Sequence, residues 1–228
     1  MSEQKLFINE IFSSIQGEST YAGLPCTFVR LSGCSLRCNY CDSSYAFREG
    51  VKYEVPQIVD MVRKLENDLV EITGGEPLLQ SSVINLMEEL CDLGMEVLLE
   101  TSGVLDIQVC DSRVIRIVDI KTPHSGASGS FLDSNYEHLS KKDELKFVIT
   151  NRDDFDWSLD LVKQRDLCDI VNAVHFSPVM FQLQNEFVEG CESLPPVQLA
   201  KWILDSELPI RLHMQMHRYV WDPEARGV

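Results

Sequence analysis

Residues 27–42 have the sequence TFVRLSGCSLRCNYCD, in which an apolar run leads into a loop that carries three cysteines. The run Thr27–Leu31 predicts a β-strand, because branched and aromatic side chains pack well on a pleated sheet. After the loop, apolar residues recur at helical spacing over residues 55–65, and the apolar run Leu69–Thr73 predicts the next strand. A strand, a helix and a further strand in this order predict a parallel pair with a right-handed crossover.

The same alternation continues along the rest of the chain. Further strands are expected at residues 95–100, 116–120, 145–150, 173–176 and 210–214, and helices around residues 83–94, 157–163 and 195–205. Six or seven strands are fewer than the eight of a complete TIM barrel. The chain, residues 1–228, is therefore expected to form one α/β domain, a shortened, open (partial) TIM-type β/α barrel with a mainly parallel, six- to seven-stranded sheet. A doubly wound open sheet is the alternative, since periodicity alone does not separate the two folds.

Polar and glycine-rich segments follow the expected strands. They comprise residues 34–43, 74–77, 101–103, 121–126, 177–178 and 215–217. In parallel α/β folds the carboxyl ends of the strands are where ligands bind. The six segments therefore predict one site at one rim of the sheet.

Charge and composition exclude several classes of partner. The chain has 36 acidic and 20 basic residues, a formal net charge of −16, which disfavours nucleic acid and membrane partners. Residues 1–9 lack the features of a signal peptide, and no apolar run approaches the about 18 residues that span a bilayer. Eight cysteines without a secretion signal then indicate the reducing cytoplasm rather than a disulfide scaffold.

Cys34, Cys38 and Cys41 have the spacing C-x3-C-x2-C. Three thiolates of one loop can converge on a soft metal centre. A structural zinc site would need a fourth Cys or His at close spacing, and none lies nearby. A [4Fe–4S] cluster normally has four thiolate ligands, so three would leave one iron open to a substrate. The other cysteines are scattered beside apolar residues and are expected to fill the core: Cys26, Cys91, Cys110, Cys168 and Cys191.

The cysteine loop, with Tyr40 before the last cysteine, resembles the cluster motif of the radical S-adenosylmethionine (SAM) superfamily. Gly74-Gly-Glu-Pro77, which follows the next strand, is similar to the GGEP motif of that superfamily. The resemblance implies a [4Fe–4S] cluster on Cys34, Cys38 and Cys41, whose open iron is chelated by the amino and carboxylate groups of SAM. It also implies that an electron from the reduced cluster splits SAM into methionine and a 5′-deoxyadenosyl radical.

Longer blocks across nearly the whole chain are similar, in order and spacing, to the 7-carboxy-7-deazaguanine synthases. The blocks are residues 10–18 (EIFSSIQGE), 28–34 (FVRLSGC), 41–43, 73–80 (TGGEPLLQ), 100–103 (ETSG), 119–126 (DIKTPHSG), 143–148, 176–179, 215–221 and 226–228. The resemblance implies a radical SAM enzyme that converts 6-carboxy-5,6,7,8-tetrahydropterin into 7-carboxy-7-deazaguanine, with loss of ammonia. This is a lyase reaction of queuosine and 7-deazapurine biosynthesis, in which SAM is regenerated at each turnover.

The family resemblance also implies the binding residues. For SAM they are Tyr40, Cys41, Asp42, Gly75, Glu76, Ser102, Lys121, Thr122, Pro123, Ser177, Pro178 and Val179. For the pterin they are Ile15, Gln16, Gly17, Arg30, Thr73, Gln215, His217 and Val228. Of these, Arg30 offers a planar fork that suits the substrate carboxylate. Mg²⁺, which prefers oxygen ligands, is implied at Ser43, a position where many members have threonine.

Each of these residues also has a plainer explanation. Arg30 could be a surface arginine, Ile15–Gly17 a simple turn, and Thr73 only a strand former. Ser43 could cap a turn. His124 and His175 could carry protons near pH 7, but packed or exposed side chains are favoured for both. Arg218 stands where the family commonly has lysine.

Two other functions share part of the pattern. An activase that abstracts hydrogen from a glycine of a partner protein would need the three cysteines and Gly74–Pro77, but not Gln16, Arg30 or residues 221–228. A non-catalytic iron–sulfur or zinc-binding module would not cleave SAM. The family resemblance further implies a flavodoxin or ferredoxin as electron donor, and a homodimer.

Overall fold

The structure is a computed structural model of the chain, and it describes residues 5–180, 193–222 and 225–227. Cys191 and Val228, which the sequence assigned to the core and to the substrate site, lie outside the described residues.

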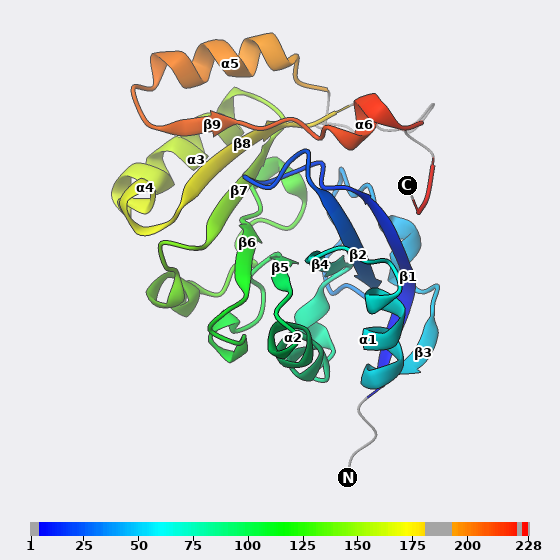
Figure 1. Cartoon of the computed structure of the whole chain (residues 1–228). Helices are drawn as coiled ribbons and strands as arrows, with labels where there is room; N and C mark the ends of the chain where they lie inside the picture. The colour runs from blue at the N-terminus through cyan, green and yellow to red at the C-terminus, as the bar shows by residue number, and fades with distance from the viewer. Residues whose placement is uncertain (1–4, 181–192, 223–224, 228) are drawn as a thin grey trace.

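The described residues form one nine-stranded sheet in the order β3-β1-β2-β4-β5-β6-β7-β8-β9. The strands are β1 (Lys5–Ile15), β2 (Pro25–Leu31), β3 (Val51–Glu54), β4 (Leu69–Gly74), β5 (Glu96–Thr101), β6 (Ile115–Asp119), β7 (Glu144–Ile149), β8 (Ala173–Pro178) and β9 (Ile210–Leu212). Neighbours from β2 to β9 pair in parallel, whereas β1 pairs antiparallel with both β2 and β3. The sheet does not close, because β3 and β9 are its two edges (Figure 1).

This open, mainly parallel α/β sheet confirms the predicted fold class, and its seven parallel strands are those expected from the sequence. The antiparallel strands β1 and β3 were not predicted. Residues 5–15 lack a clean alternation of apolar and polar side chains, and in the structure most residues of β1 are only half-buried. β3 has only four residues, three of them exposed, and carries too little pattern to be recognised.

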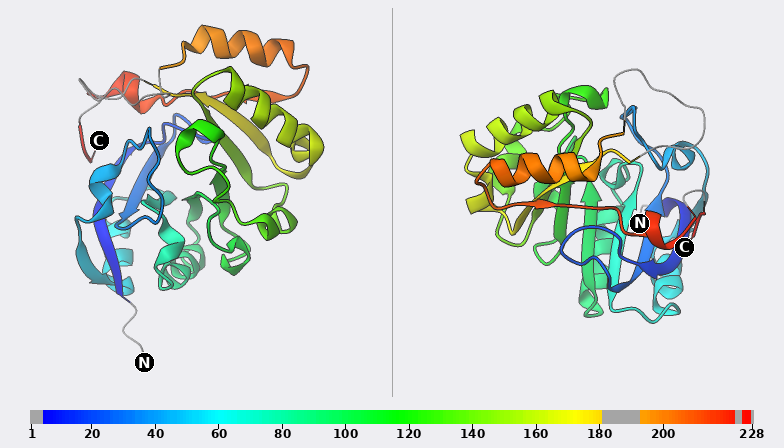
Figure 2. Two further views of the ribbon diagram at one scale, coloured as in Figure 1. Left: turned by 180° about the vertical axis from the view of Figure 1, so that it is seen from behind. Right: turned by 90° about the horizontal axis from the view of Figure 1, so that it is seen from above.

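Except for the last one, which lies at the rim of the cavity, the helices cover the outer face of the sheet (Figures 1 and 2). They are α1 (Val55–Arg63), α2 (Val83–Asp92), α3 (Arg152–Gln164), α4 (Leu167–Ile170), α5 (Pro196–Asp205) and α6 (His217–Val220). Buried side chains of α1, α2, α3 and α5 belong to one apolar cluster with the outward-facing strand residues, as in a barrel rather than a doubly wound sheet. Among the described residues, no helix combines the length and the apolar character that a bilayer crossing requires.

Side chains close in sequence cap the starts of two helices. The carboxylate of Glu54 and the amide of Gln57 form a capping box at the start of α1, and Asn151 accepts a hydrogen bond from the backbone N–H of Asp154 at the start of α3. Short 3-10 segments follow several strands: Ser44–Phe47, Pro77–Leu79, Ile107–Val109, Pro123–Ser125 and Asp133–His138.

The inner face of the sheet is layered. Side chains alternate along each strand, so on β4 Val70 and Ile72 join the outer core while Glu71 and Thr73 face inward. A second apolar cluster fills the inner face near the amino ends of the parallel strands: Cys26, Phe28, Leu69, Leu98 and Ile117. Polar side chains lie beyond this apolar floor, toward the carboxyl ends.

The C-terminal segment lies beside the end of β1 (Figure 2). The backbone N–H of Met216 donates to the carbonyl of Gly17 over 2.9 Å. The Arg226 guanidinium lies 4.0 Å from the centroid of the Tyr45 ring. These contacts bring residues about 200 positions apart in sequence to the same rim as the cysteine loop.

Candidate active site

A cavity of about 620 Å³ opens at the carboxyl ends of the parallel strands. Most of the residues implied by the sequence line it: Ile15, Gln16, Gly17, Arg30, Cys34, Cys38, Tyr40, Cys41, Asp42, Ser43, Thr73, Gly75, Ser102, Lys121, Ser177, Pro178, Val179, Gln215 and His217. Glu76, Thr122 and Pro123 do not line it. The six polar segments therefore do meet at one rim, and the roles of their individual side chains stay predictions.

The three cysteines of the loop are free, half-buried thiols on the cavity wall. Burial raises the pKa of the Cys38 thiol to about 11, with Lys121 lowering it and Cys34 and Cys41 raising it further. Within the described residues no three Cys, His, Asp or Glu side chains are already drawn together as a metal site. Three soft ligands on one loop nevertheless fit a cluster held by three cysteines, whose thiols lose their protons on binding iron.

The GGEP turn after β4 packs directly on this loop. The N–H of Gly75 donates to the Leu31 carbonyl over 3.1 Å, and that of Glu76 to the Gly33 carbonyl over 2.8 Å. A Cβ atom on Gly75 would lie 2.0 Å from the Gly33 oxygen and 2.9 Å from the Cys34 Cβ. Only glycine allows the two backbones to approach this closely.

Glu76 is fully buried behind the cavity wall. Its carboxylate accepts hydrogen bonds from the Thr101 hydroxyl (2.7 Å), the Ser102 N–H (2.9 Å), the Ser102 hydroxyl (2.6 Å) and the Leu78 N–H (3.2 Å). The structure thus places this side chain where it fixes the end of β5 to the GGEP turn. Direct contact of the Glu76 carboxylate with SAM stays a prediction.

The segment after β6 is tied to both the cysteine loop and α3. Asn39, between Cys38 and Tyr40, donates from its backbone N–H to the Ser125 carbonyl over 2.8 Å and from its amide to the His124 carbonyl over 3.0 Å. The His124 ring lies 3.0 Å from a carboxylate oxygen of the buried Asp154. His124 is therefore held outside the cavity.

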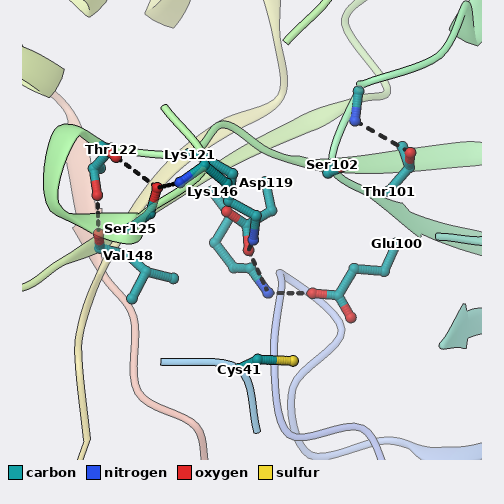
Figure 3. Close-up of polar contacts among 12 residues, drawn as sticks. Cys41, Glu100, Thr101, Ser102, Asp119, Lys121, Thr122, Ser125, Lys146 and Val148 are labelled. Carbon is teal, nitrogen blue, oxygen red and sulfur yellow. Dashed lines mark hydrogen bonds and ion pairs between the residues drawn. The ribbon is translucent and has the colours of Figure 1, made fainter. Parts of the chain in front are cut away.

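A cluster of charged side chains crosses the inner face (Figure 3). The Lys146 ammonium on β7 contacts the carboxylates of Glu18 (2.8 Å), Glu100 and Asp119 (3.8 Å), and Lys121 binds Asp119 over 2.8 Å. Although burial disfavours its charge, these carboxylates raise the pKa of Lys146 well above its usual value. In return, Lys146 and neighbouring histidines hold the pKa of Glu18 below its usual range against the effect of burial.

Of these charged residues, only Lys121 was assigned a role from the sequence. For the members that lie on strands, and for Glu71, a signal is nevertheless present, because each occupies an inward-facing position of a largely apolar strand. Glu71 interrupts LVEIT, Glu100 ends EVLLE, Asp119 ends IRIVD, and Lys146 interrupts ELKFVI. A lone charge at an alternate position of a buried strand indicates a polar interior.

Arg30 is a cavity residue rather than a surface arginine. Its side chain is 17% exposed, and its Nε donates to Glu10 over 2.7 Å. The guanidinium also lies 5.9 Å from the ring centroids of Phe12 and Tyr45.

Gln16 is almost wholly buried, and its amide is used within the protein. Its nitrogen donates to the Glu71 carboxylate and its oxygen accepts from the Glu18 N–H over 3.0 Å. The expected contact of this amide with the substrate therefore competes with two internal partners.

Ser43 and the C-terminal segment complete the rim of the cavity. The Ser43 hydroxyl lies 4.0 Å from the Cys41 sulfur. The Gln215 amide donates to Glu18 over 2.8 Å and to Asp42 over 3.1 Å, which links the loop after β1 with the cysteine loop. A Cβ on Gly17 would lie 2.3 Å from the His217 Nδ1, so these two segments are in close contact.

Comparison with known proteins identifies the family. Residues 28–123 match the model of the Radical SAM superfamily. The chain is 43% identical over 224 residues to the 7-carboxy-7-deazaguanine synthase of Koribacter versatilis, covering 97% of this chain and 99% of that protein. It is 40% identical to the 7-carboxy-7-deazaguanine synthase of Chlorobaculum tepidum, covering 100% and 99%.

Solved structures agree with the fold. The crystal structure of QueE from Escherichia coli superposes with a TM-score of 0.71 at 20% identity, covering 93% of this chain and 95% of that one. Streptococcus suis SuiB bound to S-adenosylmethionine superposes with a TM-score of 0.60 at 15% identity, covering 85% and 51%. Because similarity to the two synthases extends over almost the full length of each, the chain belongs to the 7-carboxy-7-deazaguanine synthase family of radical SAM enzymes.

Proposed function

We propose that this protein converts 6-carboxy-5,6,7,8-tetrahydropterin into 7-carboxy-7-deazaguanine and ammonia. The observation that carries the proposal is the cavity at the strand ends, where the cysteine loop and Arg30 line one space together with Thr73 and the Ile15–Gly17 turn. An activase for a partner protein would have no use for an internal arginine on the wall of this cavity. A non-catalytic module would not need the cavity.

Membership of the radical SAM superfamily implies a [4Fe–4S] cluster and SAM. When bound, they supply the 5′-deoxyadenosyl radical that abstracts hydrogen from the substrate. Cys34, Cys38 and Cys41 would hold the cluster. Residues that would hold SAM are Tyr40, Cys41, Asp42, Gly75, Ser102, Lys121, Ser177, Pro178 and Val179, with Glu76, Thr122 and Pro123 supporting them from behind the wall.

Arg30 would orient the substrate by its carboxylate. Glu10 occupies the Nε–H of this guanidinium. The remaining N–H donors belong to its two terminal nitrogens, which can bind a carboxylate side by side. The rings of Phe12 and Tyr45 restrict the movement of the guanidinium. Other substrate contacts would come from Ile15, Gln16, Gly17, Thr73, Gln215, His217 and Val228.

The charged cluster around Lys146 would control protons beside the substrate. The Lys146 ammonium keeps its proton between Glu18 and Glu100. It also offsets part of the negative charge of these carboxylates, which lets an anionic substrate lie next to them. The Thr73 hydroxyl donates to Glu100 over 3.1 Å, so this substrate-side residue is oriented by the same cluster.

Mg²⁺ would be held at Ser43, where it would offset the negative charge of the substrate carboxylate. The Ser43 hydroxyl supplies the oxygen ligand, and waters would complete the shell that this ion prefers. Its place on the cavity wall beside Cys41 supports this assignment.

The remaining features of the proposal follow the family. Residues 1–228 would form a single catalytic domain that works in the cytoplasm as a homodimer, without nucleic acid or membrane partners. A flavodoxin or ferredoxin would supply the electron.

Anaerobic incubation of the reduced protein with the pterin substrate, SAM and Mg²⁺ tests the proposal. We expect the ultraviolet and mass signatures of 7-carboxy-7-deazaguanine, and their loss in Cys38→Ala because one iron ligand is removed. A reduced protein that cleaves SAM but leaves the pterin unchanged would refute the assignment.

A further inference from the structure

Glu71 is a buried carboxyl group that faces the cavity. It lies on β4 between the inward-facing Leu69 and Thr73, and its side chain is 4% exposed. Its strand neighbours at the same level are Phe28 of β2 and Leu98 of β5, both members of the apolar floor. This carboxyl therefore stands at the boundary between the floor and the polar rim.

A hydrogen bond from Gln16 fixes the orientation of this carboxyl. The Gln16 amide nitrogen donates to Oε2 of Glu71, and its oxygen accepts from the Glu18 N–H. Both polar atoms of the amide are thus committed to the protein. Glu71 is then a further polar group, besides Gln16, that this part of the wall can present to a ligand.

The surroundings of Glu71 favour the neutral acid. Burial raises its pKa to about 8, and the carboxylates of Glu100 and Glu18 add to the shift while Gln16 and Lys146 oppose it. The Cys26 thiol of β2 also lies close, and burial and Glu71 raise its pKa in turn. At neutral pH the Glu71 carboxyl therefore offers an O–H donor beside a carbonyl acceptor.

We propose that Glu71 is a specificity-determining residue that pairs with the lactam edge of the pterin ring, an inference that rests on the proposed function. The acid O–H would donate to the ring carbonyl C4=O, and the acid carbonyl would accept from the ring N3–H. An ionised carboxylate has acceptors only and could not complete this pair. The neutral form thus selects a lactam over a ring with an amino group in place of the carbonyl.

Binding measurements without turnover test this inference. The holoprotein, with SAM present and its cluster left oxidised, is titrated anaerobically with 6-carboxytetrahydropterin by calorimetry. We expect Glu71→Gln to bind within about threefold of the native protein at pH 7, because an amide keeps one donor beside one acceptor. We expect Glu71→Ala to bind about tenfold more weakly, since it leaves the buried ring edge unpaired.

The pH dependence of pterin affinity shows whether Glu71 binds as the neutral acid or as the carboxylate. The affinity of the native protein for the pterin should fall as the pH rises from 7 to 9, because Glu71 ionises. The affinity of Glu71→Gln should lack the part of this decrease that is due to Glu71. Any change in affinity that comes from ionisation of the substrate should be the same for both proteins. The matched control is Glu96→Gln, an exposed position on neighbouring β5 that binds Tyr21 outside the cavity, and it should keep native affinity and pH dependence.

Three results would overturn the inference: native affinity in Glu71→Ala, equal losses in the glutamine and alanine variants, or the same pH profile in the native protein and Glu71→Gln. Each would leave the proposed function in place as long as the native protein binds the pterin. A native holoprotein that binds no pterin would overturn the proposed function together with the inference.

Discussion

His213, just beyond β9, is a buried imidazole that the proposed chemistry does not use. Its Nε2 accepts a hydrogen bond from the Ser19 N–H over 2.8 Å, which holds the loop after β1. Its Nδ1 is buried with no hydrogen-bond partner within the described residues. Burial lowers the pKa of His213 to about 4, with Lys146 and His175 lowering it further against the effect of Glu18 and Glu144. The fold therefore requires the neutral ring.

His213 should make the protein acid-sensitive. An unfolded histidine binds a proton near pH 6.5, so the contribution of the neutral ring is full above that pH and is lost as the pH falls toward about 4. Acidification over this range should lower the free energy of unfolding by about 3 kcal/mol through His213. Urea unfolding of the apoprotein at pH 7 and pH 4.5 should show a smaller decrease for His213→Gln, whose amide oxygen can still accept from Ser19.

The control for this experiment is His138→Gln, a half-buried histidine of the Asp133–His138 segment. It should keep the native dependence of unfolding free energy on pH. If His213→Gln loses as much stability in acid as the native protein, then another group governs the acid sensitivity.

Among the structural elements, the cysteine loop depends on the GGEP turn for its shape. Replacing Gly75 by alanine would place a Cβ against the Gly33 carbonyl and the Cys34 side chain, and the turn would have to move away from the loop. We expect Gly75→Ala to fold but to hold less than about half of the native iron after anaerobic reconstitution, measured as iron per chain.

A matched glycine separates this clash from a general loss of stability. Gly94, after α2, has φ of +82° and no atom within 4 Å of its virtual Cβ. Gly94→Ala should cost about 1 kcal/mol through backbone strain, yet keep native iron. Native iron content in Gly75→Ala would show that the loop does not need the close approach.

The sequence predicts the strands and helices more completely than it predicts the contacts within the candidate active site. The parallel strands and the main helices were predictable, because buried strands and amphipathic helices have distinct periods. The cysteine loop and Gly74–Pro77 were predictable because local spacing sets their chemistry. The partners of Glu76 and Gln16 were not, since both depend on contacts between segments far apart in sequence.

For the molecule as a whole, the net charge of −16 should affect its encounter with the proposed electron donor. An acidic flavodoxin and this protein should repel each other at distances up to the Debye length. We expect the rate of cluster reduction by an acidic flavodoxin to rise severalfold between about 10 and 200 mM salt, measured by stopped-flow absorbance.

Reduced methyl viologen, a small cation, is the control reductant. Its rate should fall over the same range, because salt then screens an attraction. A flavodoxin rate that falls with salt would indicate that a local basic surface outweighs the overall charge.

The contact between Gly17 and Met216 also determines when the cavity can form. Its wall needs residues 215–218 and 225–227, so a nascent chain cannot complete it until these residues have left the ribosome. Cluster insertion before that point would expose the iron to solvent, which favours insertion after residues 225–227 have emerged. Lys5 lies at the opposite end of β1 from the cavity. An affinity tag attached ahead of Lys5 should therefore leave the cavity open.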